Sequence, residues 1–431
     1  MEAENCPQIL YRLRPPKAIY EFNELEKQEI HFSRFNELND PMEGFLNLYW
    51  KGDKVVWVNF FKNFITSLFV LNYWFRFLYK NGSLENKPIW IPQDAEDVIF
   101  WRSKKELNYL FDEFFKDATI IKLIDFLSSS KTNKYSDEII FILTIIIGEL
   151  QHNIQRVFVG HKYDKCRDDY INEYITYNGI DFKEKRTKLL ITIIRDLYIS
   201  DCFNSEIEPI KSFKKYILTD FSSDFLKELE KNLYMEHYTA SFTENIEDLS
   251  LWGYYADGHK GFALKFKTPI NFRENGAIHK KIQYTDTFPE IDFFQNIAGG
   301  VNVSTLDNAW WVDIKEKKES YLYEKMSSNL DEWRKKYWGL INQNLSLKNM
   351  AWEKEKEYRY IINDKFINYS NNRNLVYDLS CLCGIVFGAR METSDKLEII
   401  RILESKIEMN QEFNFYQAVY EDGKIKTIKA F

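Results

Sequence analysis

Apolar residues recur at intervals of three and four positions through a long central stretch of the chain, from about residue 53 to residue 234. This spacing places the apolar side chains on one side of an α-helix. Few glycines interrupt the pattern, so we expect an all-helical block there. The runs that show it most clearly are Phe60–Tyr79, Leu107–Leu127, Ser136–Val159, Phe182–Ile199 and Phe221–Tyr234.

The sequence on either side of this block has the alternation and the turn residues of β-strands. Ile9–Arg14 alternates and then meets Pro15 and Pro16, which cannot donate hydrogen bonds to a sheet. A hairpin is expected near the end of the chain around Asp422-Gly423, a favoured turn pair. We predict an α+β protein, a mainly antiparallel β lobe interrupted by a large all-helical insertion. The predicted parts are residues 1–52, 53–235 and 236–431.

A highly charged segment, Trp352–Ile362, is the strongest candidate for a function. If it is extended, alternation places three carboxylates and a guanidinium on one face, those of Glu353, Glu355, Glu357 and Arg359. Carboxylates two residues apart on a strand lie about 7 Å apart and titrate together. The alternative is a solvated edge strand whose charges discourage aggregation.

Length and composition indicate a globular protein with a substantial core. The chain has 431 residues, of which 45 % are hydrophobic and 17 % aromatic. This length favours two lobes, or one domain with a large insertion. The net charge of −7 arises from 58 basic and 65 acidic residues, so a polyanion-binding surface over the whole fold is not expected. A local basic patch remains compatible with these totals.

Cysteine usage and hydropathy favour a cytoplasmic protein. The cysteines form neither a paired framework nor a cluster at zinc-finger spacing; they are Cys6, Cys166, Cys202, Cys381 and Cys383. The most apolar runs, 55–79 and 139–150, do not fit a membrane span, because the first contains charged residues and the second is short. Residues 1–10 do not read as a signal peptide. We expect no metal and no membrane partner.

Two further segments have both a functional and a structural interpretation. Trp252–Gly261 combines glycines with large aromatic residues, so it is either a loop that closes on a ligand or a tight turn with ordinary packing. Glu149 and His152 share one face of a predicted helix. They would need a third ligand to hold a metal, so a polar stripe on the helix is favoured.

Several motifs in a fixed order resemble the bacterial family called Domain of Unknown Function 2971. They are Leu10–Arg14, Ile30–Ser33 followed by Asn39-Asp40-Pro41, Ser241–Glu244 with Trp252–Gly261, and Trp352–Arg359. Val386-Phe387-Gly388 is similar to the closing strand of that family. The resemblance covers residues 8 to 50 and 236 to 405, which makes the helical block an elaboration of this member.

The same order more distantly resembles ADP-ribosyltransferases, in which an Arg on the first strand precedes a Ser-Thr-Ser-like strand and a later Glu-x-Glu strand. By this resemblance the three roles fall to Arg12 or Arg14, to Ser241 and Thr243, and to Glu355 and Glu357. Phe242 replaces the middle hydroxyl, and a long segment separates the second motif from the third. The resemblance implies an ADP-ribosyltransferase-like β lobe that takes NAD as its substrate.

The chemistry of NAD explains why such residues are needed. Its diphosphate favours the planar, permanently charged guanidinium of Arg. Cleavage of the nicotinamide–ribose bond develops positive charge on the ribose, which a fixed carboxylate stabilises. We expect Glu357 to hold the ribose and Glu355 to orient the acceptor or take its proton. The other residues expected to contact or brace NAD are Arg12, Arg14, Tyr11, Ser241, Thr243, Tyr254, Tyr255 and His31, although a strand histidine bonded to its neighbours is the favoured interpretation of His31.

Three functions are compatible with the sequence. The first is an NAD-consuming enzyme that transfers ADP-ribose to protein, nucleic acid or water, in bacterial stress or phage defence. The second is a non-enzymatic binding or sensor protein in which Arg12, Glu355, Glu357 and Arg359 form a structural ion network. The third is a nucleic-acid enzyme or sensor, suggested by the aromatic residues and by Lys and Arg in the helical block. The helical block is expected to be a regulatory, partner-binding or substrate-selecting unit, with a regulatory partner as one possibility.

Overall fold

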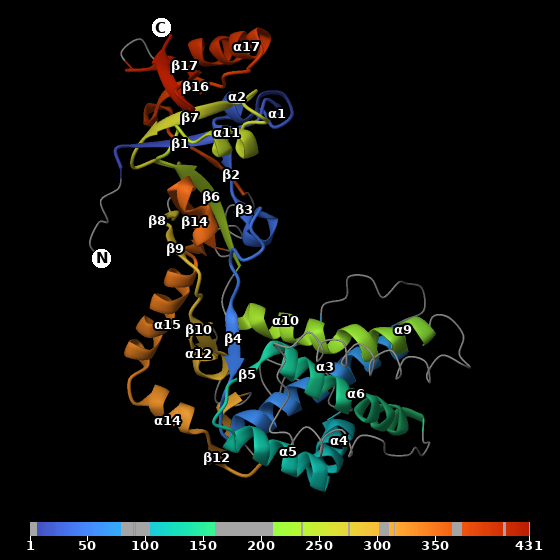
Figure 1. Cartoon of the computed structure of the whole chain (residues 1–431). Coiled ribbons are helices and arrows are strands. Elements are labelled where there is room, and N and C mark those ends of the chain that lie inside the picture. Colours follow the sequence, from blue (N-terminus) through green and yellow to red (C-terminus); the bar gives the residue numbers. More distant parts are fainter. Residues whose placement is uncertain are drawn as a thin grey trace. The chain divides into compact units, whose positions relative to one another are not determined.

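A computed structural model describes residues 7–78, 89, 91, 104–159, 210–233, 236–274, 276–300, 310–313, 315–363, 373–407 and 411–430. The chain forms two compact units (Figure 1). Unit 1 comprises residues 1–46, 235–289 and 340–431, and unit 2 comprises residues 47–234 and 290–339. The predicted α+β class is confirmed, and most strand pairs are antiparallel.

A nine-stranded sheet forms the centre of unit 1. Its strands follow the order β18-β17-β16-β7-β1-β6-β14-β8, and β3 pairs with β6 outside this path. Along the path only β16 and β17 run parallel. The strands are β1 (Ile9–Arg14), β3 (Ser33–Arg34), β6 (His237–Thr243), β7 (Phe262–Lys267), β8 (Ile278–Lys281), β14 (Glu357–Asn363), β16 (Leu382–Phe387), β17 (Asn414–Glu421) and β18 (Lys424–Lys429).

Shorter elements complete unit 1. Two small strand pairs join β2 (Glu29–His31) to β15 (Asn374–Val376), and β9 (Gln283–Thr285) to β13 (Leu347–Asn349). The helices are α1 (Lys17–Tyr20), α2 (Glu24–Lys27), α11 (Leu249–Tyr255) and α17 (Thr393–Glu404). Single 3-10 turns occur at Phe35–Glu37, Met350–Glu355 and Leu379–Cys381.

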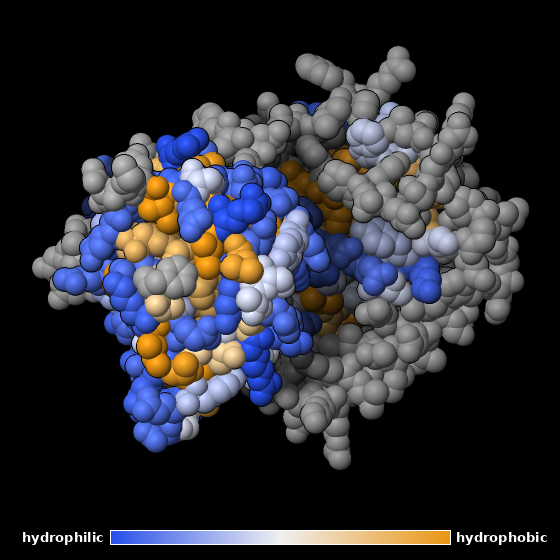
Figure 2. Space-filling view, turned by 90° about the horizontal axis from the view of Figure 1, so that it is seen from above, coloured by the Kyte–Doolittle hydropathy of each residue, from blue (hydrophilic) through white to orange (hydrophobic). Residues whose placement is uncertain are grey.

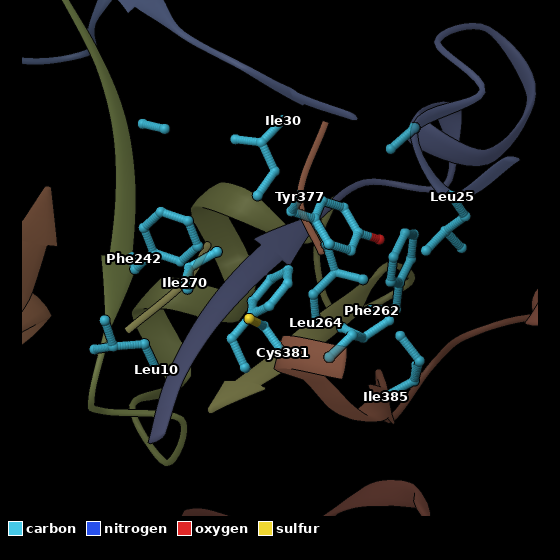
Figure 3. Packing of buried hydrophobic residues seen from close by; sticks show 14 of the residues in the cluster. Leu10, Leu25, Ile30, Phe242, Phe262, Leu264, Ile270, Tyr377, Cys381 and Ile385 are labelled. Atoms are coloured by element: carbon cyan, nitrogen blue, oxygen red, sulfur yellow. The ribbon is translucent and has the colours of Figure 1, made fainter. Parts of the chain in front are cut away.

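The two faces of the sheet have separate apolar cores, because successive side chains of a strand point to opposite faces. The larger core contains Phe242 of β6 and Leu264 of β7, and Ile399 of α17 is part of it (Figure 3). The smaller core, on the other face, contains Leu13 of β1 together with Trp252 of α11. Strand residues that belong to either core are packed against apolar side chains, so a polar site can form only from the strand residues outside them.

The described helices of unit 2 are α3 (Lys54–Leu78), α4 (Lys104–Lys116), α5 (Ala118–Ser129), α6 (Ser136–Val159), α9 (Ile210–Tyr216), α10 (Ser222–Leu233), α12 (Phe293–Gly300) and α14 (Tyr321–Ser327), with a π turn at Ile217–Phe221. Helix α15 (Leu330–Asn344) begins in unit 2 and ends in unit 1. The strands of unit 2 are β4 (Asn47–Trp50), β5 (Lys134–Tyr135), β10 (Glu290–Asp292), β11 (Val312–Asp313) and β12 (Lys318–Glu319). The predicted run at Phe182–Ile199 and Cys6, Cys166 and Cys202 lie outside the described residues.

Helix α3 is the central helix of unit 2. The Asp53 carboxylate accepts hydrogen bonds from the backbone N–H groups of Val55 and Val56 at its first turn. Among the described residues, one helix, at Lys54–Phe75, is long and apolar enough to cross a membrane, and 72 % of that apolar stretch is buried inside the fold. Burial of this extent is typical of a core helix.

The observed division differs from the predicted one at residues 290–339, which belong to unit 2 rather than to the β lobe. Strand β10 pairs in parallel with β4, which is far away in the sequence. The Asn59 side chain of α3 donates hydrogen bonds to the backbone carbonyl oxygens of Trp310 and Val312, at 2.9 and 3.0 Å. Contacts between residues so far apart in the sequence produce no local hydrophobic pattern. The periodicity of the sequence therefore could not predict that residues 290–339 belong to unit 2.

Candidate functional site

The pairing of three neighbouring strands aligns residues from distant motifs. Tyr11 of β1 lies opposite Thr243 of β6, and Thr243 lies opposite Glu357 of β14. Ser241 lies opposite Arg359 in the same way. Because directly paired residues share a face of the sheet, the three strands present Tyr11, Ser241, Thr243, Glu357 and Arg359 on one side.

The charged segment is extended only in its second half. Residues Met350–Glu355 form a 3-10 turn, and Lys356 has a left-handed backbone with φ of 44°. Strand β14 therefore begins at Glu357, and the expected strand from Trp352 is wrong for its first residues. Glu353 is exposed, whereas Glu355 and Glu357 are buried. The 3-10 turn, and not the alternation of a strand, directs the side chain of Glu355 toward Glu357.

The Asn39-Asp40-Pro41 motif brings a further carboxylate to the same place. The Asp40 side chain accepts a hydrogen bond from the Met42 N–H at 2.9 Å, and the Glu43 N–H donates to the Asp40 carbonyl oxygen at 3.1 Å. This turn directs the Glu43 side chain onto Arg359. Gly44 ends the turn with φ of +70°, and an added Cβ would lie 2.8 Å from the Phe35 Cβ, so the position favours glycine.

Five charged side chains form one buried network, called the charge cluster below: Glu43, Lys348, Glu355, Glu357 and Arg359. The Lys348 Nζ lies 3.1 Å from Glu43 Oε1, 2.7 Å from Glu355 Oε2 and 2.8 Å from Glu357 Oε2. The Arg359 Nε donates to Glu357 Oε1 at 2.7 Å, and its Nη2 donates to Glu43. Each of these side chains is at most 9 % exposed. A single ammonium thus joins three carboxylates.

Neutral groups hold the carboxylates in place. The Tyr255 hydroxyl donates to Glu355 Oε1 at 2.8 Å. The Thr243 hydroxyl donates to the Glu355 backbone carbonyl oxygen and accepts from the Asn245 N–H. The Glu357 N–H donates to the Tyr284 hydroxyl at 2.7 Å. Fixed partners of this kind keep a charged site from rearranging when a substrate binds.

The electrostatics of the charge cluster separate its carboxylates. Burial alone would raise the pKa of Glu357, but the charges and hydrogen bonds of Arg359 and Lys348 outweigh it and lower that pKa to about 2. For Glu43, burial dominates and the nearby Glu357 adds to it, so its pKa is raised despite Arg359 and Lys348. Glu357 is therefore the permanently ionised member, and Glu43 is a member that takes up a proton more readily than usual.

Aromatic side chains lie beside the charge cluster near Glu355. The Lys348 Nζ is 5.1 Å from the centre of the Trp352 ring, and the Trp352 ring packs edge-on against Tyr254. Tyr254 is 69 % exposed, and Trp352 is half-buried. The cluster therefore borders solvent-accessible aromatic surface on the side of Glu355, where a flat ring can stack.

The two arginines expected to bind phosphate lie on the opposite face of the sheet. The guanidinium carbon of Arg12 lies 5.5 Å from the centre of the Phe242 ring, in the larger apolar core. Its Nη1 donates to the Ser241 backbone carbonyl oxygen at 2.9 Å and its Nη2 to that of His31 at 3.3 Å. Arg14 forms an ion pair with Glu24. Arg12 and Arg14 therefore do not meet Glu357 on one face of the sheet, contrary to the expectation.

The environment of Arg12 differs from that of the cluster. Burial lowers the pKa of its guanidinium to about 9, the neighbouring Arg14 adds to this effect, and Glu24 partly offsets it. His31 lies on β2, outside the main sheet, and its Nδ1 is 2.6 Å from the Asn374 side-chain oxygen. Through these contacts Arg12 joins β1 to β6 and β2, and His31 joins β2 to β15.

Sequence reasoning missed two members of the cluster, Glu43 and Lys348. Glu43 closely follows the Asn39-Asp40-Pro41 turn motif, which is visible in the sequence. A polar residue placed just after such a turn could have been predicted as a site residue. Lys348 lies on the short strand β13 between Leu347 and Asn349, where the sequence gave no signal. Glu149 and His152 are both on α6, as expected, and among the described residues no group of three or more His, Cys, Asp or Glu side chains could hold a metal ion.

The fold and the site define an α+β protein with a buried, many-membered charge cluster where its characteristic motifs meet. Residues 251–360 match a family described as Protein of unknown function (DUF2971). This match includes Trp252–Gly261 and Trp352–Arg359, and it confirms the predicted resemblance to that family. No curated protein and no solved structure matched the chain.

Proposed function

We propose that the chain is an enzyme that consumes NAD, cleaving its nicotinamide–ribose bond and transferring ADP-ribose to an acceptor, with the charge cluster as its working site. The observation that carries the proposal is the pair Glu355 and Glu357, held by the single ammonium of Lys348 in a buried setting. Fixed carboxylates shielded from water stabilise a developing ribosyl cation. The cluster contains one more carboxylate than it has cations, which favours a positively charged reacting group.

The reaction balances with the groups of the cluster. The bond between the ribose carbon and the nicotinamide nitrogen breaks, and its electron pair leaves with nicotinamide, which becomes neutral. An oxygen of the acceptor, or of water, then forms a bond to the positively charged ribose carbon. That oxygen loses its proton to a carboxylate. A positioned base of this kind contributes roughly a hundred- to ten-thousand-fold in rate.

The geometry suggests different roles for the two glutamates. Both carboxylate oxygens of Glu357 are held by Lys348 and Arg359, so Glu357 is a positioning residue that fixes these two cations. Glu355 lies next to the aromatic surface of Tyr254 and Trp352 and is the most exposed carboxylate of the cluster, at 9 %. We assign the contact with the ribose or with the acceptor to Glu355, and stacking of the nicotinamide ring to Tyr254.

The proposal leaves the diphosphate of NAD to groups other than Arg12, Arg14 and His31. The two arginines lie on the opposite face of the sheet, and His31 is bonded to Asn374. Ser241 and Thr243 are on the face of Glu357, and Thr243 braces the backbone of Glu355. Their part in the proposal is to hold the carboxylates rather than to contact phosphate.

A comparison of two neighbouring glutamates tests the proposal. The purified protein is incubated with NAD, and released nicotinamide is quantified by chromatography. We expect Glu355→Gln to lower the release at least a hundred-fold, because the charge that stabilises the cation is removed. The matched control is Glu353→Gln, which changes an exposed carboxylate in the same 3-10 turn and should leave the release unchanged. Equal activity of Glu355→Gln and the wild-type protein contradicts the proposal.

A second candidate is a non-enzymatic binding or sensor protein in which the cluster is a structural ion network. The observation that favours it is that Lys348 and Arg359 tie the turn at residues 40–43 to β14 through buried charges. In this case the wild-type protein releases no nicotinamide, and NAD does not raise its melting temperature. Glu355→Gln then lowers only the melting temperature.

A further inference from the structure

The face of the sheet that holds Glu357 on β14 continues across five more strands, β6, β1, β7, β16 and β17. Tyr11 lies opposite Lys265 of β7, Lys265 lies opposite Gly384 of β16, and Gly384 lies beside Asn414 of β17. One row of paired residues therefore runs from Asn414 through Lys265, Tyr11 and Thr243 to Glu357. Tyr11 is two strands from Glu357, a separation of roughly 10 Å at the usual strand spacing.

Helix α11 covers only part of this face. It packs through Trp252 near Leu13, Val386 and Ile425, which form the smaller apolar core. At the edge of that core, the row residues Tyr11 and Lys265 and the neighbouring Tyr416 are half-buried, and the two tyrosines pack against the core. The Lys265 Nζ lies 3.1 Å from the Tyr416 hydroxyl and 4.2 Å from the centre of its ring. Gly384 adds no side chain between the two tyrosines.

Positive charge gathers at this part of the sheet. Lys265, Lys267 and Lys429 all lie close enough to Glu412 to lower the pKa of its carboxyl, with the hydrogen bond from Lys267 as the largest cause. Lys267 and Glu412 form an ion pair at 3.0 Å and are 51 and 77 % exposed. Three lysines thus act on Glu412, and Glu247 is the smallest of the charges that act on Tyr11. The surface is locally basic in a chain of net charge −7.

Apolar and aromatic side chains are also exposed at the surface of unit 1. Figure 2 shows apolar residues grouped among hydrophilic ones on the face that it presents. Tyr420 of β17, on the same face as Tyr416, is 50 % exposed, and Ile428 of β18, on the opposite face, is 55 % exposed. An open sheet face that combines half-exposed tyrosines with lysines has the two elements of single-strand recognition, rings on which bases stack and cations that contact phosphates.

We propose that this face, composed of Tyr11, Lys265, Lys267, Tyr416 and Lys429 and called the sheet platform, binds single-stranded nucleic acid. A second part of this inference rests on the proposed function: the bound strand is the acceptor of ADP-ribose. The row of paired residues leads from the sheet platform to Glu357, which brings the strand toward the charge cluster. Phosphates contact Lys265 and Lys429, and a base stacks on Tyr11. Recognition is by stacking and charge, so it is weakly dependent on base sequence.

Direct binding to oligonucleotides tests this proposal without NAD. Fluorescence anisotropy is measured with labelled 12-nucleotide single-stranded RNA, single-stranded DNA and a DNA duplex, at 50 and 200 mM salt. We expect both single strands to bind more tightly than the duplex, and the affinity to fall as salt increases. Tyr11→Leu keeps an apolar side chain beside the smaller core and should weaken binding roughly ten-fold through loss of stacking.

Two lysines of one strand supply a matched pair. Lys429 pairs with Tyr416 and lies on the platform face, whereas Lys424 pairs with Glu421 and lies on the opposite face of the same strand. Lys429→Gln should weaken binding and reduce the slope of log affinity against log salt concentration by about one. Lys424→Gln should change neither the affinity nor this slope. Equal losses in the two variants, or no binding of either single strand at 50 mM salt, overturn the proposal.

The outcome is separable from that of the proposed enzyme activity. Selective binding with the expected variant pattern supports the sheet platform even if the protein releases no nicotinamide. Absence of binding overturns it even if nicotinamide is released, since water or a protein then serves as the acceptor.

Discussion

At the scale of single residues, Glu357 depends on its neighbours for its charge. It is 3 % exposed, and a carboxylate in such a setting would ordinarily take up a proton. Arg359, two residues along β14, and Lys348 keep it ionised. The same contacts join Glu43 and Glu355 to the network, so removal of one charge leaves others without a full complement of partners.

Glu357→Gln should therefore destabilise the protein, by about 3–5 kcal/mol at pH 7, because it leaves Arg359 and Lys348 buried with a reduced counter-charge. The pKa of Glu357 is lowered to about 2, so its stabilising effect is present above pH 4.5 and is lost as the pH falls toward 2. Urea unfolding at pH 7 and pH 3 measures both. The difference between the wild-type protein and the variant should shrink at pH 3, and a constant difference contradicts the assignment.

At the scale of elements, the turn at residues 40–44 is the piece that completes the charge cluster. Its Asp40 side chain sets the backbone, Glu43 contacts Arg359, and Gly44 allows the chain to leave beside Phe35. The turn is short, but without it the two cations lose one of their three carboxylates. A change in its backbone is therefore expected to affect the cluster as well as the loop.

Gly44→Ala should lower the free energy of unfolding by about 1–3 kcal/mol, since alanine is strained at φ of +70° and its Cβ would meet Phe35. Gly339→Ala in α15 is the matched control. An added Cβ there meets nothing within 4 Å, and alanine favours the helix, so the control should stabilise by up to about 1 kcal/mol. Chemical denaturation measures both variants, and a stabilising Gly44→Ala would refute the role of the turn.

Several elements could be predicted from the sequence because their signals are local. The proline pair after Ile9–Arg14, the Asp422-Gly423 turn and the helical spacing of α3 and α6 each depend on neighbouring residues. The start of β14 was missed because the left-handed Lys356 and the 3-10 turn before it have no distinct local signature. Glu355 and Glu357 do lie close together, as expected, but a 3-10 turn and not strand alternation brings them together.

At the scale of the whole molecule, Glu357 of unit 1 and two buried carboxyls of unit 2 respond to pH in opposite directions. Glu357 in unit 1 contributes stability that is lost as the pH falls below 4.5. In unit 2, burial raises the pKa of Asp292 to about 7, and burial likewise raises that of Glu230 to about 7. Stability from these two groups is present below their ordinary pKa values and is lost as the pH rises through 7.

Asp292→Asn should flatten the pH dependence of unit 2. The raised pKa of Asp292 corresponds to a loss of free energy of unfolding on the order of 4 kcal/mol as the pH rises from 4 to 7. The variant has no carboxyl at this position and should not show this loss. Amide hydrogen exchange at pH 5 and pH 7 reports each unit separately. Glu290→Gln, an exposed change on the same strand, is the control. Retention of the full pH dependence in Asp292→Asn would exclude this carboxyl as its source.

The division into units and the membership of the charge cluster could be predicted only in part. The helical block was found from its periodicity, but the return of residues 290–339 to it depends on the pairing of β10 with β4. The sequence did not reveal that Arg12 and Arg14 lie on the face opposite Glu357, because strand register decides which residues share a face, and a shift of one residue reverses every side chain. Charge and residue type identified the candidates, whereas sheet pairing decided which of them meet.

The ion pair between Glu43 and Arg359 spans 316 positions of the chain. During translation Glu43 leaves the ribosome long before Lys348 and Arg359 are made, and the whole helical segment emerges in between. A product terminated before Lys348 consequently has an acidic turn without its counter-ions. The charge cluster forms only in polypeptides that have been synthesised beyond Arg359, with β15 to β18 still to follow.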